Sequence, residues 1–319
     1  MKYTKAFIFL SFLFWLNPLH AQQVDCYPVN WWVHMKNPKL QIMLHGKDLA
    51  NGNHYTINYP GVKIEKIHKV ENSNYVFLDL LITPSCKAGD FIIKISGKKS
   101  YEIKYSLKPR RKGNGTQYAQ GIYSSDLIYL IMPDRFSNGD TSNDRIVGMR
   151  DQSLNRDTVY DRHGGDLRGI QNHLDYFTSL GVNTLWLNPV IENDMPNRTE
   201  HGYAFTNHYK IDPRIGGEVA YHQLIDAAHA KKMKVIQDAV YNHVGSYHFT
   251  VLDPPMKDWL NQWPHFTKSN YKDQVLFDPY ASAEEKKVMS DGWFVKTMPD
   301  LNQRNPYVAN FLIQHAIWT

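Results

Sequence analysis

The feature that most constrains the fold is a change in hydrophobic periodicity partway along the chain. From Val24 to about Leu107, apolar residues alternate with polar ones in short runs separated by Gly, Pro and Asn. The clearest runs are 40–44, 76–82, 91–95 and 101–105. Alternation with period two is typical of strands that bury one face. We therefore predict an antiparallel β-sandwich domain over residues 22–107.

Strands alternating with helices are predicted after this domain. Residues 108–120 are charged and glycine-rich, and we interpret them as a linker. Apolar runs then begin at Leu127, Asn183 and Met233, as buried parallel strands require. A helix is predicted at 169–180, with Ile170, His173, Leu174 and Phe177 on one face and Gly181 as the stop. A second is predicted around 221–228. A third is predicted to begin after Asn305 as the N-cap, with Pro306 as its first residue. This alternation predicts an α/β domain over 121–319 that contains the first three units of a (β/α)8 barrel, which is incomplete.

The first 21 residues have the pattern of a signal peptide. Lys2 and Lys5 precede an apolar run, and Ala21 supplies a small residue before an expected cut at Gln22. The run is too short to span a bilayer comfortably, so we favour a cleaved signal over the alternative of a membrane anchor. We expect an exported protein without a stable membrane anchor, in the periplasm or outside the cell.

The composition argues against one class of partner and does not decide whether the two cysteines pair. The formal net charge of +5 is weak and dispersed, which argues against a nucleic-acid partner. Cys26 and Cys86 are the two cysteines of the chain. In an oxidising compartment they either pair or remain two buried thiols, and their spacing does not decide between these outcomes.

Polar residues gather where the predicted strands end. Asp238 closes the third apolar run, and Asn242 and His243 follow it closely. A carboxylate, an amide and an imidazole at this position can pair with sugar hydroxyls, although a strand-end Asp and a core His are the alternative. After the first run, Asn138, Asp140, Asn143 and Asp144 form an oxygen-rich segment that suits either a hard cation or ordinary turns.

Four ordered segments carry a family resemblance. DAVYNHVG from Asp238 resembles the first signature region of family-13 glycoside hydrolases, the α-amylase superfamily. HGYAFTNHYKIDPRIGG from His201 resembles the loop after the second barrel strand, and MPDLN from Met298 resembles the region before the fourth. WWVHMKNPKLQIMLHGKDL from Trp31 resembles the N-terminal domain of the neopullulanase and cyclomaltodextrinase branch.

The resemblance implies a substrate site and its residue roles. His243 would hydrogen-bond the sugar next to the cut bond, and Tyr203 would stack on that sugar, unless its ring packs inward. Asp238 would organise the site and Asn242 would support the loop. The substrates implied are α-glucan oligosaccharides such as maltodextrins, cyclodextrins or pullulan. Asn207 stands where many members have Asp, so we expect an altered loop contact there.

A structural calcium ion and a homodimer are also implied by the resemblance. The calcium ligands would be Asn138, Asp140, Asn143, Asp144, Gly164 and Asp166. The dimer would form through the N-terminal domain in the full-length form.

The reacting carboxylates are expected outside this chain. A retaining glycoside hydrolase uses two carboxylates about 5 Å apart, and the family supplies them from the fourth and fifth strands. We therefore expect this chain, which closes at Thr319, to be a C-terminally truncated fragment of an α-glucan hydrolase. The alternatives are a non-catalytic starch- or maltodextrin-binding protein and a transglycosylase.

Overall fold

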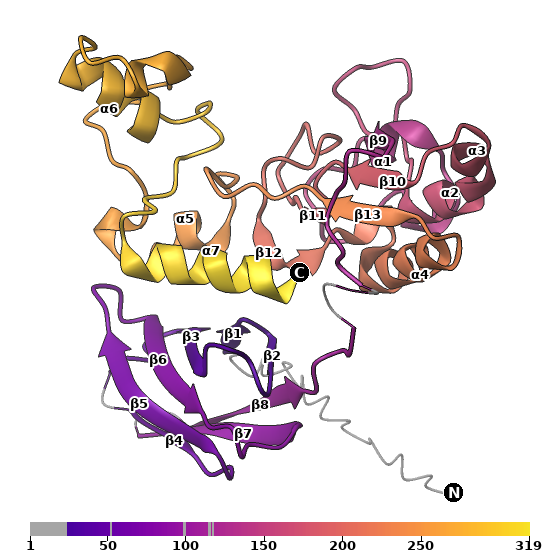
Figure 1. Cartoon of the computed structure of the whole chain (residues 1–319). Coiled ribbons are helices and arrows are strands. Elements are labelled where there is room, and N and C mark those ends of the chain that lie inside the picture. The colour runs from indigo at the N-terminus through magenta and orange to yellow at the C-terminus, as the bar shows by residue number, and fades with distance from the viewer. Residues whose placement is uncertain (1–23, 52, 98–99, 114–115, 117) are drawn as a thin grey trace, which may run out of the picture.

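The computed structural model describes residues 24–51, 53–97, 100–113, 116 and 118–319. A β-sandwich and an α/β domain lie side by side, joined by an irregular segment after β8 (Figure 1). The predicted signal peptide, 1–21, lies outside the described residues. Within them, every helix is too short or too polar to cross a membrane.

The sandwich consists of two four-stranded sheets. Its strands are β1 (Asp25–Tyr27), β2 (Asn30–Trp32), β3 (Lys39–His45), β4 (His54–Ile57), β5 (Val62–Lys69), β6 (Tyr75–Ile82), β7 (Gly89–Ser96) and β8 (Tyr101–Lys108). The sheet orders are β1-β3-β6-β5 and β2-β8-β7-β4. The predicted sandwich is confirmed, but its antiparallel pairing has an exception, since β2 runs parallel to β8.

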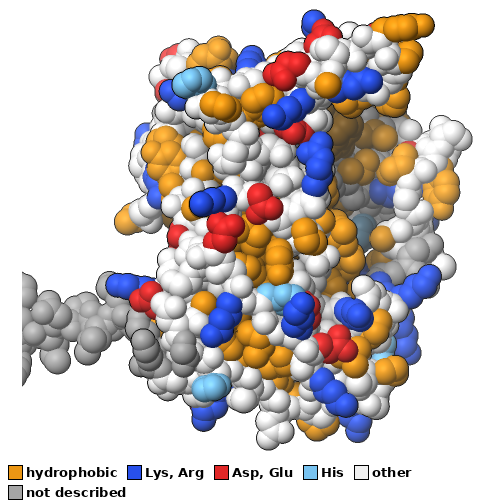
Figure 2. Space-filling model, turned by 90° about the vertical axis from the view of Figure 1, so that its left-hand side faces the viewer, with side chains coloured by type: hydrophobic (Ala, Val, Ile, Leu, Met, Phe, Trp, Pro, Cys, Tyr) orange, Lys and Arg blue, Asp and Glu red, His pale blue; other side chains and the backbone are white. Residues whose placement is uncertain are grey.

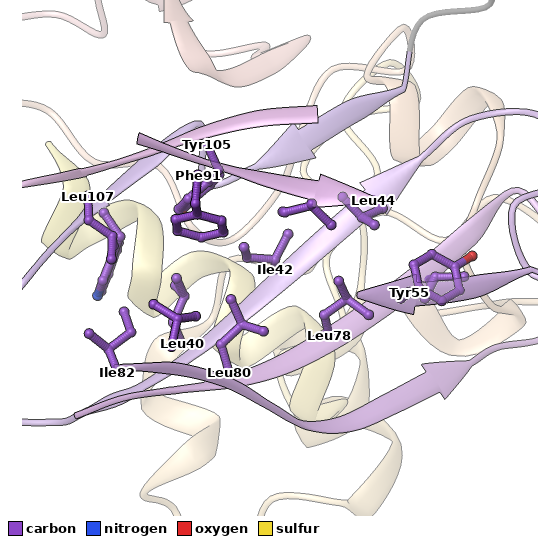
Figure 3. Packing of buried hydrophobic residues seen from close by; sticks show 14 of the residues in the cluster. Leu40, Ile42, Leu44, Tyr55, Leu78, Leu80, Ile82, Phe91, Tyr105 and Leu107 are labelled. Atoms are coloured by element: carbon purple, nitrogen blue, oxygen red, sulfur yellow. The ribbon is translucent and has the colours of Figure 1, made fainter. Parts of the chain in front are cut away.

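The alternating residues form the sandwich core. Leu40, Ile42 and Leu44 are at most 1% exposed and pack against residues of the facing sheet such as Phe91 and Tyr105 (Figure 3). Cys86 is buried in this core and Cys26 packs against it, and both are free thiols. The described structure therefore favours the unpaired alternative for the cysteines.

Strand β6 is buried on both faces, which its alternation did not predict. Tyr75 and Phe77 point away from the sandwich core and are at most 1% exposed. The Phe77 ring lies 4.6 Å from that of Tyr307 and 6.3 Å from that of Trp259, centroid to centroid. The second face of β6 is thus the surface on which the α/β domain packs.

The α/β domain is built on three parallel strands in the order β13-β10-β9. These are β9 (Ile128–Ile131), β10 (Thr184–Leu187) and β13 (Lys234–Gln237), and the helices are α1 (Pro133–Phe136), α2 (Leu167–Asn172), α3 (Leu174–Ser179), α4 (Gly217–Ala230), α5 (Phe249–Leu252), α6 (Ala283–Asp291) and α7 (Pro306–Trp318). A two-stranded sheet of β11 (Ile191–Glu192) and β12 (Asn207–Ile211) is inserted before α4. Asn305 caps α7 by accepting from the Tyr307 N–H, as predicted.

Two local predictions were wrong. Strand β9 is not buried, because it lies at the edge of the sheet and leaves Ile128 40% and Leu130 55% exposed. The predicted helix from Gly169 is two helices that break at His173, whose backbone is not helical. Its ring Nδ1 lies 2.7 Å from the Gly169 carbonyl, and the side chain is exposed instead of facing the core.

The segment between β13 and α7 projects from the domain and carries α6 at its tip (Figure 1). Figure 2 shows one face of the molecule, on which exposed apolar side chains are scattered among acidic and basic ones. A short backbone bridge joins Asp300, near the end of this segment, to His243, which follows β13 closely. A second bridge, between Leu260 and Leu301, lies within the segment.

Candidate functional site

The ends of β10 and β13 bring together two of the predicted site residues. Asp238 follows β13, and its Oδ2 accepts from the Tyr203 hydroxyl at 3.0 Å and from Trp186 Nε1 at 3.1 Å. Burial, and next the Asp238 carboxylate, raise the pKa of Tyr203 to about 12, which keeps the phenol protonated. Asp238 is therefore engaged in holding two aromatic side chains.

His243 lies close by, with a buried imidazole ring. Its side chain is 6% exposed, and its ring stacks on Phe294 with centroids 5.0 Å apart and planes 17° apart. Burial lowers its pKa to about 4, so the imidazole is neutral near pH 7. Its Nδ1 lies 3.4 Å from Asn242 Nδ2, and its Nε2 is a buried atom. The Tyr203 backbone is a further hydrogen-bonding neighbour of the ring.

A cavity of about 750 Å³ joins these side chains. His201, Tyr203, Asn242, His243 and Phe294 are part of its wall. The remaining lining comes from Met195, Pro196, Asn197, Arg198, Ala204, Ala239, Val240, Tyr241, Ser246, Tyr247, Val295, Thr297 and Met298. Aromatic faces with a few polar groups suit a neutral polyhydroxylated ligand. No Asp or Glu stands among the described residues that line it.

The position of Tyr203 agrees in part with both alternatives from the sequence, a ring that faces the sugar site and a ring that packs inward. Its ring borders the cavity, but it also packs against the α/β core and lies 5.8 Å from the His201 ring. The neighbouring Gly202, at φ +81°, has no room for a side chain, because an added Cβ would lie 2.1 Å from the Pro189 carbonyl oxygen. The close contact between Gly202 and Pro189 therefore fixes the position of the loop that carries Tyr203.

The Asn207 position has local contacts of its own. The Asn207 side-chain oxygen accepts from the Tyr209 N–H at 3.0 Å, and its Nδ2 donates to the Tyr27 hydroxyl at 3.3 Å. Asn207 therefore ties the loop to the first strand of the sandwich.

The oxygen-rich residues after β9 also come together. Asn138 Nδ2 donates to Asp144 Oδ1 at 2.7 Å, and a Cβ on Gly164 would lie 2.8 Å from that same oxygen. Buried oxygens without a hydrogen-bond partner in the described structure remain on Asn138 and Asn143. Buried acceptors are normally satisfied, so these two oxygens fit a cation ligand.

The two other predicted metal ligands have partners already. Asp166 is fully buried and caps α2 through Gly169, and its carboxylate also accepts from the Asp140 N–H at 2.8 Å. Asp140 accepts in turn from Ser142, which lowers its pKa. No group of three or more His, Cys, Asp or Glu in the described part of the chain is placed to hold a metal ion. A cation here would depend on amide and carbonyl oxygens as well as carboxylates.

Sequence reasoning missed Trp186 and Phe294. Trp186 belongs to a run that was read only as a buried strand, and its exposed fraction of 38% is the sign that it faces outward. Phe294 comes from the projecting segment, far from His243 along the chain. A Trp-Phe pair three residues before MPDLN was the available signal for it.

Comparison with protein families finds two matches. Residues 130–318, more than half of the chain, match the family described as "Alpha amylase, catalytic domain". Residues 25–111 match the one described as "Cyclomaltodextrinase, N-terminal".

Individual proteins of known name are similar as well. Neopullulanase 2 of Thermoactinomyces vulgaris is 27% identical, over 77% of this chain and 43% of its own length. The periplasmic alpha-amylase of Escherichia coli is 30% identical, over 52% of this chain and 28% of its own. The crystal structure of an Anoxybacillus alpha-amylase is 35% identical, covers 60% of this chain and 37% of its own, and superimposes with a TM-score of 0.48. The chain thus spans less than half the length of these relatives.

Proposed function

Because this chain belongs to the α-amylase family, we propose that its cavity binds α-glucan oligosaccharides as the front part of an enzyme that hydrolyses α-glucosidic bonds. The observation that carries the proposal is that His243 and Tyr203 stand together in the wall of one cavity. A neutral imidazole can donate to or accept from a sugar hydroxyl. The Tyr203 ring supplies an apolar face beside it.

The bond cleavage itself is assigned to other residues. Asp238 already accepts from two aromatic side chains, and the described cavity lining contains no carboxylate. A retaining reaction needs a nucleophile and an acid/base about 5 Å apart. We propose that these come from sequence that the longer relatives have beyond the matched region.

The test is sugar binding by the chain as it stands. We expect maltoheptaose and a cyclodextrin to bind in calorimetry, and His243→Ala and Tyr203→Ala to weaken the binding at least about 10-fold, since each removes a direct contact. His222→Ala, at an exposed position on α4, is the matched control and should bind as the wild type does. Absence of binding by a folded wild-type chain would reject the proposal.

A maltodextrin-binding protein without turnover is the second candidate. The carboxylate-free lining of the described cavity favours it over an enzyme complete in itself. Release of reducing sugar by the purified chain would exclude this candidate. Binding without release would fit both this candidate and a fragment, and a longer form carrying the missing strands would then separate them.

Calcium is proposed as a structural ion at the loop after β9. The free buried oxygens of Asn138 and Asn143, beside Asp144 and the backbone of Gly164, offer the oxygen ligands that a hard cation needs. Such an ion would hold the loop together and take no part in the reaction. Asp140 and Asp166 are proposed as further ligands, because a carboxylate that accepts N–H groups keeps lone pairs for a cation.

Export and dimerisation complete the proposal. Export rests on the signal-like segment at the N-terminus, and a similar protein of Escherichia coli is periplasmic by name. A homodimer through the sandwich domain rests on the resemblance of residues 25–111 to the cyclomaltodextrinase N-terminal domain. Light scattering of the chain with and without the sandwich tests the dimer.

A further inference from the structure

Side chains of four sandwich residues converge on Asp253, which directly follows α5 in the α/β domain. Its Oδ1 accepts from Asn72 Nδ2 at 2.6 Å, and its Oδ2 accepts from Asn74 Nδ2 at 2.8 Å. His45 Nε2 lies 3.0 Å from the same Oδ2, and the Tyr75 hydroxyl donates to the Asp253 carbonyl at 2.7 Å. Against burial, which alone would raise it, the hydrogen bonds from Asn74, His45 and Asn72 hold the pKa of Asp253 below its usual value. The carboxylate is therefore ionised at neutral pH, the state in which it binds such donors most strongly.

The first residue of α5 also packs on the sandwich. The Phe249 ring stacks on that of Tyr27, with centroids 4.8 Å apart and planes 15° apart. The His45 ring lies 5.8 Å from that of Phe249 and 4.3 Å from that of Tyr75. Within α5, the Asp253 N–H donates to the Phe249 carbonyl at 3.0 Å. Both ends of this short helix are thus fixed against the sandwich.

The turn that precedes α5 forms part of the cavity wall. Ser246 and Tyr247 lie in this turn and line the cavity. The His248 N–H donates to the Gly245 carbonyl at 2.8 Å and closes the turn, and the His248 side chain caps α5. The Gly245 N–H donates to the Phe205 carbonyl at 2.8 Å, which holds the start of the turn on the α/β domain. Tyr247 therefore lies between two anchors, one in the α/β domain before it and one on the sandwich after it.

We propose that Asp253 is a positioning residue: through it the sandwich holds α5, and with α5 the turn that keeps Tyr247 in the cavity wall. The step toward sugar rests on the proposed function. Asp253 is not among the described residues that line the cavity, so it acts on a ligand only through this turn. A wall that is held in place before the ligand arrives does not have to be ordered at the cost of binding energy.

The decisive measurement is amide hydrogen exchange of residues 245–253 in the intact chain, followed by NMR. We expect Asp253→Ala to speed exchange of the His248 amide, which closes the turn, at least about 10-fold, because losing the contacts to the sandwich makes local opening easier. An unchanged exchange rate in folded Asp253→Ala would overturn the proposal.

Asp79→Ala is the matched control. Asp79 also accepts from an amide, Gln41 Nε2 at 2.8 Å, and lies 2.6 Å from His68 Nε2. The other ring nitrogen of His68 meets the Tyr307 hydroxyl on α7 at 3.0 Å. This variant disturbs the domain interface away from α5 and should leave the exchange of 245–253 unchanged. An equal rise in both variants would show a general weakening of the interface and would overturn the proposal.

A second variant guards against misfolding of the first. Asn72→Ala changes only the sandwich side, where Asn72 Nδ2 donates to Asp253 and also to the Pro254 carbonyl at 2.9 Å. We expect faster exchange of the His248 amide here too. Exchange at the wild-type rate in Asn72→Ala would also overturn the proposal.

Sugar affinity separates this proposal from the proposed function. We expect maltoheptaose to bind about 10-fold more weakly to Asp253→Ala, the effect of one lost contact, and as tightly to Asp79→Ala as to the wild type. If the wild type binds no sugar while exchange of the turn rises as expected, the proposed function fails and the positioning of the turn stands. If the wild type binds and Asp253→Ala binds equally well, the positioning role fails and the proposed function stands.

Discussion

A histidine buried within the α/β domain should make the protein acid-sensitive. His315, on α7, is 1% exposed, and the His208 backbone is the hydrogen-bonding neighbour of its ring. Its ring meets those of His208 at 5.1 Å and Tyr209 at 5.4 Å, both nearly edge-on. Burial lowers the pKa of His315 to about 4.

The sign and size of the effect follow from this pKa. The folded chain resists protonating His315, whereas the unfolded chain protonates it near its ordinary pKa of 6.5. The stability is therefore fully present above pH 6.5 and is lost as the pH falls toward 4. Between these two pKa values, pH 5 should lower the free energy of unfolding by roughly 2 kcal/mol through this residue alone.

The perturbation is His315→Phe, which keeps an aromatic ring in an aromatic site and removes the titration. Urea unfolding followed by tryptophan fluorescence at pH 7.5 and pH 5 gives the stability loss of each form. We expect the variant to lose roughly 2 kcal/mol less than the wild type over this interval. His222→Phe, at an exposed position on α4, is the control and should behave as the wild type. Equal pH dependence in His315→Phe and wild type would refute the argument.

Three further predictions concern the loop after β9, the domain interface and the cavity rim. Calcium should raise the melting temperature of the wild type by a few degrees, and Asn143→Leu should abolish this rise; an equal rise in both, in a thermal-shift assay, would place the ion elsewhere. Phe77→Ala should cost about 3–5 kcal/mol in urea unfolding, because Phe77 is buried against Tyr307; a cost below about 1 kcal/mol would mean that the domains do not pack here. Gly202→Ala should lower stability by more than about 1 kcal/mol, since the new Cβ meets the Pro189 carbonyl, and an unchanged melting temperature would contradict that.

Much of the fold could be predicted because it depends on local patterns. Alternation along 40–44 buries Leu40, Ile42 and Leu44, and Asn305 with Pro306 begins α7 at the expected residue. The break at His173 could not be predicted from helical periodicity. There a side chain competes for a backbone carbonyl, and periodicity carries no information on that competition.

The residues of the candidate site were likewise predicted only in part. The position of Asp238 at a strand end, and of Asn242 and His243 just after it, is a local property that the sequence shows. Phe294 and Asp300 reach the same place only because the projecting segment returns and bridges to His243. Sequence separation conceals such contacts, since they depend on the path of a long excursion.

The sequence by itself determined the strand runs of the sandwich, the alternation of strands and helices after it and the family, because these follow from periodicity, capping and motif spacing. Only the tertiary structure decided that β6 buries its second face on α7, that β9 is exposed at a sheet edge and that Asp166 serves as a helix cap. The physical reason is that burial and hydrogen-bond partners belong to pairs of distant segments. A sequence pattern within one segment carries no information on the distant segment against which it packs.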